Sequence, residues 1–435
     1  MIQQRLVIIS LDALGSRDLD DHLAELPNLR RLVVTGTRVK QVQGIYPTLT
    51  YPSHTTIITG QYPKDHGIVN NTKRQPQRQS PDWYWYQRDV QVPTLYDLVR
   101  RQHRKTAAFL WPVTAGSKIT YNLAEIFPNR IWTNQVLVSL KASSPAFLLR
   151  MNQKYGHLRR GIQQPELDDF ITACAVDTLK HKKPWLTLIH LVDMDSMRHR
   201  YGVRSDEALA ALHRLDQRVG QLIDATIEAG TFAQTNFAIL GDHYQINVDH
   251  MIHLNQAFAK RGWLTPTTAG TVKNDWHVWA KSCDGSTYVY TRNFADLKTL
   301  RTLLEQTPGV ERVSDQQTAQ VRGADPTCRF MVEAQAGYYF TDETNRAEVV
   351  EAVDPDSLGQ PDRYHSVHGY DPLKSDYFTT LVLNGPSVKE NQTIERAALI
   401  DEAPTFAALL GVKFPNALPG HTLLDALKGA SHEAD

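Results

Sequence analysis

Short apolar runs alternate with helical patterns along most of this chain, and this alternation constrains the fold more than any other feature. Each run has the length of one strand and lacks strict polar alternation, which is typical of strands buried on both faces. Such strands, separated by helices, indicate an α/β fold with a mostly parallel central sheet and helices on both faces. The runs that we interpret as strands are Arg5–Leu11, Thr106–Leu110, Trp185–Val192, Asn236–Leu240 and Thr379–Leu383.

Helical patterns fill the stretches between these strands. Ser205–Gly230 is the clearest, with apolar residues at helical spacing, Ser205 as the N-cap and Gly230 as the stop signal. Pro165–Leu179 carries a proline in its first turn and one apolar face. The last helix is expected to include Ile400–Leu410.

Between residues 261 and 345 the pattern changes to short strands around one helix. We expect a small inserted α+β subdomain there, and one catalytic domain formed by residues 1–260 and 346–435. The expected strands are Val278–Ala280, Ser286–Thr291, Val310–Val313 and Gly337–Phe340, and the expected helix is Asn293–Gln306.

Charge and cysteine content disfavour several classes of function. Lys+Arg and Asp+Glu both number 47, so the formal net charge is zero and a nucleic-acid polymer is not an expected partner. The three cysteines are far apart, which disfavours a disulfide framework or a cysteine zinc site.

No apolar run is long enough for a membrane span, and the run near the N-terminus is too short for a signal peptide. We therefore expect a cytoplasmic protein, with a secreted protein as the alternative if the chain is the trimmed form of a longer one. The sequence leaves the oligomeric state open.

Residues of the types that bind metals lie next to four of the expected strands. In open α/β sheets, ligands bind at the carboxyl ends of the strands. Taken singly, each residue is more often a cap, a turn residue or a surface residue, but together they indicate a metal site. Oxygen and imidazole ligands without thiolate suit Zn²⁺ and, less selectively, Mn²⁺ or Fe²⁺. The candidates are Asp12, Asp195, His199, Asp242, His243 and His368.

A hydroxyl-rich turn, Thr48-Leu49-Thr50, precedes a short helical pattern at His54–Gly60, and Pro52 suits the first turn. Thr50 is thus expected just before a helix N-terminus, where free N–H groups and the helix dipole favour a phosphate. A threonine is a poor nucleophile unless its pKa is lowered. At this point Thr48 and Thr50 both remain candidates.

The segment PTLTYPSH…TGQYPKDHGIVNN resembles the nucleophile motif of the nucleotide pyrophosphatase/phosphodiesterase family of the alkaline phosphatase superfamily. The resemblance runs from Asp12 to the C-terminal segment LIDEAPTFAALLGVKFPNALPGHTL. It implies an alkaline-phosphatase-like fold, with Thr50 as the nucleophile and Asn71 in contact with a phosphoryl oxygen. It also divides the ligands between two ions: Asp195, His199 and His368 for one, and Asp12, Asp242, His243 and Thr50 for the other.

Several positions depart from the family pattern. Tyr51 replaces a phenylalanine after the nucleophile and keeps an aromatic platform for a base. His190 stands where the family has a tyrosine that helps stack the nucleobase. Arg198 replaces the glycine of the D-x-x-G-H ligand pair and would put a cation near the metal. Trp111 resembles part of the family's F-W-P segment, with core packing as the alternative. We expect Tyr51, His190 and Trp111 to contact the substrate.

The ligands and the resemblance together predict a two-metal hydrolase that cleaves phosphodiester or pyrophosphate bonds through a phospho-threonine or nucleotidyl-threonine intermediate. Asn71 and helix N–H groups near Tyr51 would stabilise the equatorial phosphoryl oxygens. The expected partner is a small phosphodiester or nucleotide, and the expected cofactors are two Zn²⁺ ions, with Mn²⁺ as the alternative.

Other functions stay open. A phosphomonoesterase, a phosphonate hydrolase or a phosphomutase of the same superfamily would use similar ligands, and a non-catalytic binding module could keep the fold. A sulfatase is disfavoured because no cysteine lies in the nucleophile turn.

Overall fold

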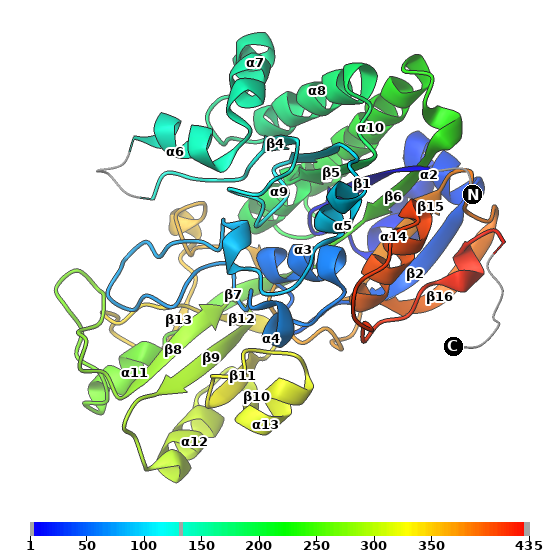
Figure 1. The fold of residues 1–435 in the computed structure, drawn as a ribbon. Coiled ribbons are helices and arrows are strands. Elements are labelled where there is room, and N and C mark those ends of the chain that lie inside the picture. The colour runs from blue at the N-terminus through cyan, green and yellow to red at the C-terminus, as the bar shows by residue number, and fades with distance from the viewer. Residues whose placement is uncertain (1–3, 130–133, 430–435) are drawn as a thin grey trace.

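The computed structural model describes residues 4–129 and 134–429, and an eight-stranded sheet forms the centre of this part of the chain. The strand order is β16-β2-β15-β6-β1-β5-β3-β4, and helices lie on both faces of the sheet (Figure 1). The predicted α/β architecture is therefore confirmed. No helix within the described ranges is long and apolar enough to cross a membrane.

All five predicted strands belong to this sheet. They are β1 (Arg5–Leu11), β3 (Thr106–Phe109), β5 (Leu186–Leu191), β6 (Thr235–Leu240) and β15 (Thr379–Asn384). β1 lies between β5 and β6 and is parallel to both. β15 runs antiparallel to β6 and β2, so the sheet is mostly parallel with one reversed strand.

Three further strands of the sheet were not predicted. They are β2 (Thr37–Gln43), β4 (Tyr121–Leu123) and β16 (Gln392–Ala398). β2 and β16 contain charged and amide side chains, and β16 is an edge strand that is largely exposed. β4 has only three residues. None of them therefore shows an apolar run.

Two hydrophobic cores, one on each face of the sheet, explain the apolar runs. Along β1, Val7, Ile9 and Leu11 belong to one core, whereas Leu6 and Ile8 belong to the other. The helices over the first core include α2 (Pro27–Val34), α8 (Glu166–His181) and α10 (Asp206–Glu228), and those over the second include α3 (Thr50–Thr59), α5 (Leu95–Arg101) and α14 (Glu402–Leu410).

The predicted boundaries of α10 are confirmed. Ser205 Oγ accepts a hydrogen bond from the backbone N–H of Ala208 at 3.1 Å, and Gly230 follows the helix with a φ of 68°. The other helices are α1 (Ser16–His22), α4 (Pro63–His66), α6 (Gln135–Ala142), α7 (Pro145–Tyr155), α9 (Asp193–Tyr201), α11 (Leu254–Lys260), α12 (Leu297–Gln306) and α13 (Gln316–Val321). α12 begins later than predicted, because Asp296 caps it through the N–H of Thr299.

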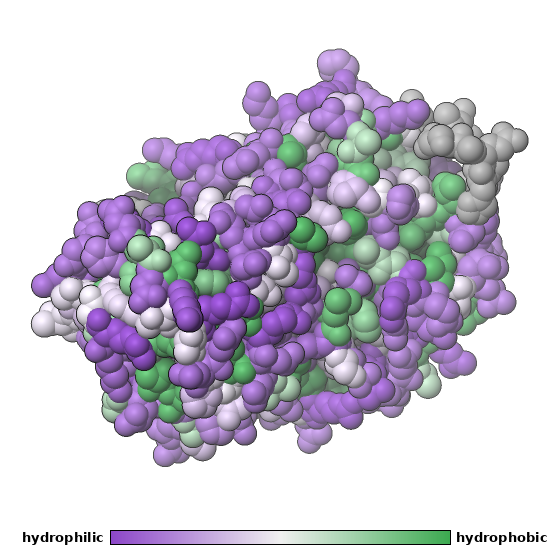
Figure 2. All heavy atoms as spheres, turned by 90° about the horizontal axis from the view of Figure 1, so that it is seen from below, coloured by the Kyte–Doolittle hydropathy of each residue, from purple (hydrophilic) through white to green (hydrophobic). Residues whose placement is uncertain are grey.

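A second, antiparallel sheet of four strands, in the order β10-β11-β9-β8, occupies the expected inserted region together with α12 and α13. Its strands are β8 (Val278–Cys283), β9 (Ser286–Thr291), β10 (Val310–Asp315) and β11 (Phe330–Ala334). The face of the molecule seen from below is mostly hydrophilic, with hydrophobic side chains in small separate groups (Figure 2), which is typical of a face exposed to water.

A small third sheet links this region to the catalytic domain. β7 (Ile246–Ile252) lies between β12 (Gly337–Phe340) and β13 (Val350–Ala352), and the short β14 (Ser366–Val367) also pairs with β7. β7 and β14 lie outside residues 261–345, and the predicted domain boundaries stay a prediction.

A charge cluster around the buried Asp371 joins the second sheet to the rest of the chain. The carboxylate of Asp371 accepts hydrogen bonds from Arg312 of β10 and from Arg322, directly after α13. Glu333 of β11 accepts hydrogen bonds from the N–H of Asp371 and from the hydroxyl of Tyr46, both at 2.9 Å. Burial opposes ionisation of Asp371, but its hydrogen bonds outweigh this effect and lower its pKa to about 2.

We expect Asp371→Asn to lower the free energy of unfolding by about 2–3 kcal/mol at pH 7, because two guanidinium groups lose a shared carboxylate. The lowered pKa means that the ionised carboxylate stabilises the fold above pH 4 and that this contribution is lost as the pH falls toward 2. Urea unfolding at several pH values measures the free energy of unfolding of the wild type and of Asp371→Asn. The exposed Asp376→Asn is the control, and equal stabilities of both variants at pH 7 would contradict the role of Asp371.

Candidate active site

The six predicted metal ligands meet at one edge of the central sheet. Because β5, β1 and β6 are parallel neighbours, the segments that follow them emerge side by side. The ligand atoms of Asp195, His199 and His368 lie within 4.8 Å of one another, and so do those of Asp12, Asp195 and His243. The six are Asp12 directly after β1, Asp195 and His199 on α9, Asp242 and His243 soon after β6, and His368 directly after β14.

The spacing between the ligand atoms matches that around a divalent ion. His243 Nε2 lies 3.2 Å from Asp12 Oδ1 and 3.2 Å from Asp242 Oδ2. His199 Nε2 lies 3.4 Å from Asp195 Oδ2. Ligands about 2.0 Å from a tetrahedral zinc ion are about 3.3 Å apart, so these groups are close enough to share an ion.

Four buried polar atoms of the ligands make no hydrogen bond within the described residues. They are Asp12 Oδ1, Asp242 Oδ2, His243 Nδ1 and His368 Nδ1. Burial raises the pKa of Asp12 and Asp242 well above the ordinary value, and it lowers the pKa of His368 to about 3. Bound cations would stabilise the ionised carboxylates and the neutral imidazoles. This donor set therefore fits divalent metal ions.

Thr50 lies beside this cluster. α3 begins at Thr50, earlier than the predicted start at His54, and Thr50 Oγ1 is 2.9 Å from His243 Nε2. Thr48 donates its hydroxyl to the carbonyl of Tyr370 at 2.8 Å and does not line the cavity in front of Thr50. The geometry thus favours Thr50 over Thr48 as a nucleophile.

Asn71 lies next to Thr50, but the expected helix donor at Tyr51 is not free. The backbone N–H of Tyr51 donates to Asn71 Oδ1 at 2.9 Å, and Pro52 has no N–H. Because Asn71 accepts this bond through its carbonyl oxygen, its NH₂ group stays available as a donor. The N–H of Tyr51, one of the two expected donors to a phosphoryl oxygen, is therefore occupied by Asn71.

A family model described as type I phosphodiesterase / nucleotide pyrophosphatase matches residues 6–371. The chain belongs to this family. The human ectonucleotide pyrophosphatase/phosphodiesterase family member 1 is 27% identical over 54% of this chain. The venom phosphodiesterase of Macrovipera lebetinus is 24% identical over 59% of it. The matches span only 23% and 28% of those two proteins.

Solved structures of the family share the fold. Human ectonucleotide pyrophosphatase/phosphodiesterase 5 has 19% sequence identity and a TM-score of 0.67, with 98% of this chain and all of that chain covered. An inactive murine form of the same protein, solved in complex with AMP, has 17% identity and a TM-score of 0.67, with 97% of each chain covered. The predicted alkaline-phosphatase-like fold is confirmed.

The positions that depart from the family pattern have clear structural roles. His190 Nε2 lies 2.8 Å from Asp12 Oδ2, and His190 Nδ1 lies 3.1 Å from the carbonyl of Leu110. His190 lines the cavity but is only 1% exposed, so its ring supports a ligand. Arg198, the cation expected near the metal, donates to Asp18 and to the carbonyl of Ala13, both at 2.5 Å.

Trp111, the third predicted substrate contact, is fully buried and does not line the cavity. It packs edge-on against His54, with ring centroids 4.8 Å apart. His54, in turn, places Nδ1 3.5 Å from Asp242 Oδ2. The structure thus places Trp111 in the core behind the ligands, and core packing was the alternative interpretation of this residue.

Further residues orient the ligands, and sequence reasoning did not single them out. His199 Nδ1 lies 2.7 Å from the carbonyl of Ser366, which leaves Nε2 for a metal. Gln245 donates to Asp195 Oδ1 at 2.5 Å. Ser366 and Gln245 come from segments near β7 and β14, and no motif marks them.

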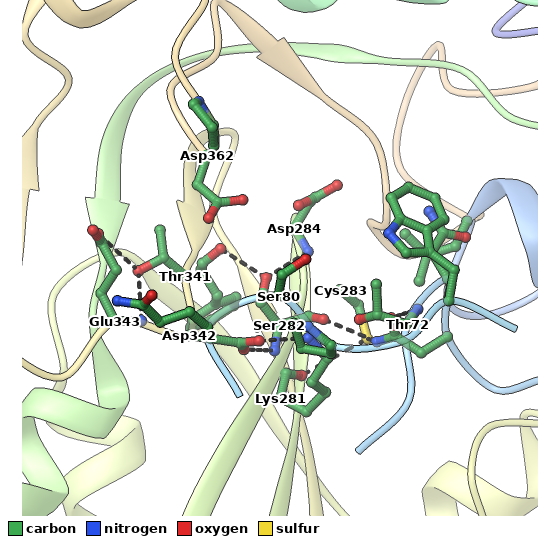
Figure 3. A pocket seen from close by; sticks show the side chains of 18 of the residues that line it. Thr72, Ser80, Lys281, Ser282, Cys283, Asp284, Thr341, Asp342, Glu343 and Asp362 are labelled. Carbon is green, nitrogen blue, oxygen red and sulfur yellow. Dashed lines mark hydrogen bonds and ion pairs between the residues drawn. The ribbon is translucent and has the colours of Figure 1, made fainter. Parts of the chain in front are cut away.

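The cavity in front of the ligands has a volume of about 770 Å³ and extends to the inserted region. Its lining includes the acidic residues Asp284, Asp342, Glu343 and Asp362 (Figure 3). Asp284 Oδ2 lies 3.6 Å from His368 Nδ1, and burial raises the pKa of Asp284 to about 7. The inserted region therefore contributes directly to the site.

Close backbone packing holds His368 against the inserted region. The carbonyl of His368 accepts a hydrogen bond from the N–H of Gly285 at 2.9 Å, and Ser286 Oγ donates to the carbonyl of Gly369. Gly369 has a φ of 81°, and a Cβ there would lie 1.6 Å from the carbonyl oxygen of Cys283. Only glycine fits at this position.

We expect the protein to bind two divalent ions per chain and Asp242→Asn to bind one, because the ligand set that the resemblance implies for the second ion, Asp12, Asp242, His243 and Thr50, loses an anionic ligand. Elemental analysis after dialysis against Zn²⁺ measures the number of zinc ions bound per chain. His277→Ala, which removes an exposed histidine of the inserted region, is the control and should bind two. An unchanged content in Asp242→Asn would remove this residue from the ligand set.

Proposed function

We propose that this protein is a metal-dependent hydrolase that cleaves phosphodiester or pyrophosphate bonds through a covalent threonyl intermediate. The contact between Thr50 Oγ1 and His243 Nε2, at 2.9 Å within the ligand cluster, carries this proposal. The relatives, which are named as phosphodiesterases and pyrophosphatases, support the reaction class. The cytoplasmic location expected from the N-terminal sequence stays a prediction.

The ligand cluster fits two divalent ions, with Zn²⁺ preferred and Mn²⁺ as the alternative. Asp195, His199 and His368 would hold one ion, and Asp12, Asp242 and His243, with Thr50, would hold the other. When bound, such ions lower the pKa of a hydroxyl or a water and offset charge on phosphoryl oxygens.

The residues of the chain then account for the two displacements. Thr50 Oγ attacks phosphorus and forms a bond to it, the bond from phosphorus to the leaving oxygen breaks, and the hydroxyl proton passes through water to the leaving oxygen. Water next attacks the phosphoryl-threonine and frees Thr50. The NH₂ group of Asn71 would donate to an equatorial oxygen, and losing such a donor typically costs about 10²–10³ in rate.

Thr50→Ala should reduce kcat for bis(p-nitrophenyl) phosphate by about 10³-fold or more, because no other hydroxyl replaces the nucleophile. Its metal content should show that the histidine and carboxylate ligands still bind. Thr48→Ala is the matched control, with an expected change of less than about tenfold because its hydroxyl binds Tyr370. Retained turnover in Thr50→Ala would place the nucleophile elsewhere.

The charges in the cavity favour a diester over a monoester. The basic residues among its described lining are Arg78, Lys281 and Arg346. Each is in a salt bridge with a carboxylate, at Asp82, Asp342 and Glu351 respectively. Above its pKa of about 7, Asp284 beside His368 adds a negative charge that repels a dianionic phosphate.

We therefore expect kcat/KM for bis(p-nitrophenyl) phosphate to exceed that for p-nitrophenyl phosphate by at least about tenfold at pH 8 and moderate salt. Both substrates release the same chromophore, so one absorbance assay compares them directly. Faster hydrolysis of the monoester would favour the phosphomonoesterase alternative.

A further inference from the structure

Arg198 lies on the helix that carries two of the predicted metal ligands, but its side chain contacts two other segments of the chain. It stands in α9 between Asp195 and His199 and is only 3% exposed. Its Nη1 donates to the carbonyl of Ala13 at 2.5 Å, and its guanidinium carbon lies 5.0 Å from the centroid of the Tyr244 ring. One buried side chain therefore connects α9 with the segments that follow β1 and β6.

Both of these segments carry ligands of the ion assigned above to Asp12, Asp242 and His243, which we call the second ion. Ala13 directly follows Asp12, and Tyr244 directly follows His243. The backbone N–H of Ala13 also donates to Asp242 Oδ1 at 3.2 Å. The guanidinium on the helix of one ligand set thus contacts the immediate neighbours of the other set.

The backbone at Ala13 is in a conformation that needs support. Its φ is 67°, in the left-handed region that is costly for a residue with a Cβ, and such a conformation persists only where the surroundings hold it. The hydrogen bonds to Arg198 and Asp242 hold both sides of the residue. Without the guanidinium, Ala13 can relax, which would move the adjacent Asp12 and remove a donor from Asp242.

The guanidinium is itself fixed in one orientation. Its Nη2 donates to Asp18 Oδ1 at 2.5 Å, and the other carboxylate oxygen of Asp18 accepts the N–H of Gly15 at 2.7 Å. The backbone carbonyl of Arg198 accepts a hydrogen bond from Ser366 Oγ at 2.7 Å. The planar fork of an arginine suits two acceptors at once. Glycine, which the family pattern has at this position, has no side chain for any of the guanidinium contacts.

We propose that Arg198 is a positioning residue for the second ion, and that it fixes Asp12 and Asp242 relative to the helix that carries Asp195 and His199. The affinity for the second ion would then depend on a side chain from the helix of the first. This inference rests on the proposed function, and it deepens it by naming a contact through which this chain holds the two ligand sets together.

The test titrates the metal-free protein with Zn²⁺ in competition with a chromophoric chelator, and two binding steps are expected. The step that is missing in Asp242→Asn belongs to the second ion. Arg198→Met keeps the apolar stem and removes the guanidinium. It should weaken the step of the second ion by about 10- to 100-fold, because groups that orient ligands have effects of this size. The other step should stay within about threefold of the wild type.

Arg214→Met is the matched control. Arg214 also holds α9, but it does so through Asp193 at the start of the helix, with hydrogen bonds of 2.7 and 2.9 Å. Its loss should leave both zinc steps within about threefold. Arg198→Lys keeps the charge beside Asp18 while one nitrogen must serve two acceptors, so it provides the test if Arg198→Met fails to fold. It should weaken the step of the second ion by at least about fivefold.

Two results would overturn the inference. One is an unchanged step of the second ion in a folded Arg198→Met or Arg198→Lys. The other is equal weakening of both steps, which would limit Arg198 to a general role in stability. A wild type that binds fewer than two zinc ions contradicts the proposed function instead.

Discussion

Repulsion among buried carboxylates at the end of the central sheet is the constraint on which the rest of the site depends. Asp12 and Asp242 follow neighbouring parallel strands and are almost fully buried. Folding brings them together in a place where water cannot screen their charges. In addition to burial, Asp195 raises the pKa of Asp12, and Asp12 raises the pKa of Asp242. Cations bound among them would relieve this repulsion, so folding and metal binding are linked in the proposed enzyme.

The neighbours of the ligands follow from the same constraint. The imidazoles of His54 and His190 each approach one of the two carboxylates. Arg198, which could have neutralised the cluster permanently, is held by Asp18 instead. The carboxylates of the cluster are therefore not neutralised by the guanidinium of Arg198, and divalent ions can balance their charge.

The sequence predicts the central sheet well because buried parallel strands produce apolar runs. Strand ends also predict that the six expected ligands lie close together, and the structure brings them to one edge of the sheet, whereas the family resemblance was needed to choose Thr50 over Thr48. The sequence does not reveal β2 or β16, whose side chains are partly solvated, nor the exact start of α3. Those features depend on tertiary contacts that one-dimensional periodicity does not record.

Side-chain direction was the other limit of sequence reasoning. The family comparison assigned His190 and Trp111 to the substrate, but His190 contacts Asp12 and Trp111 lies in the core. Position along the chain indicates which edge of the fold a residue reaches, whereas its orientation depends on the neighbours that pack around it.

The backbone packing at Gly369 has a consequence for how the protein matures. One predicted ligand, His368, is placed by a turn that fits only against the completed hairpin of β8 and β9. A chain in which that hairpin is still unformed would offer an incomplete ligand set. Metal affinity would then depend on the folding of the inserted region, so that ions would bind completely folded chains more tightly than partly folded ones.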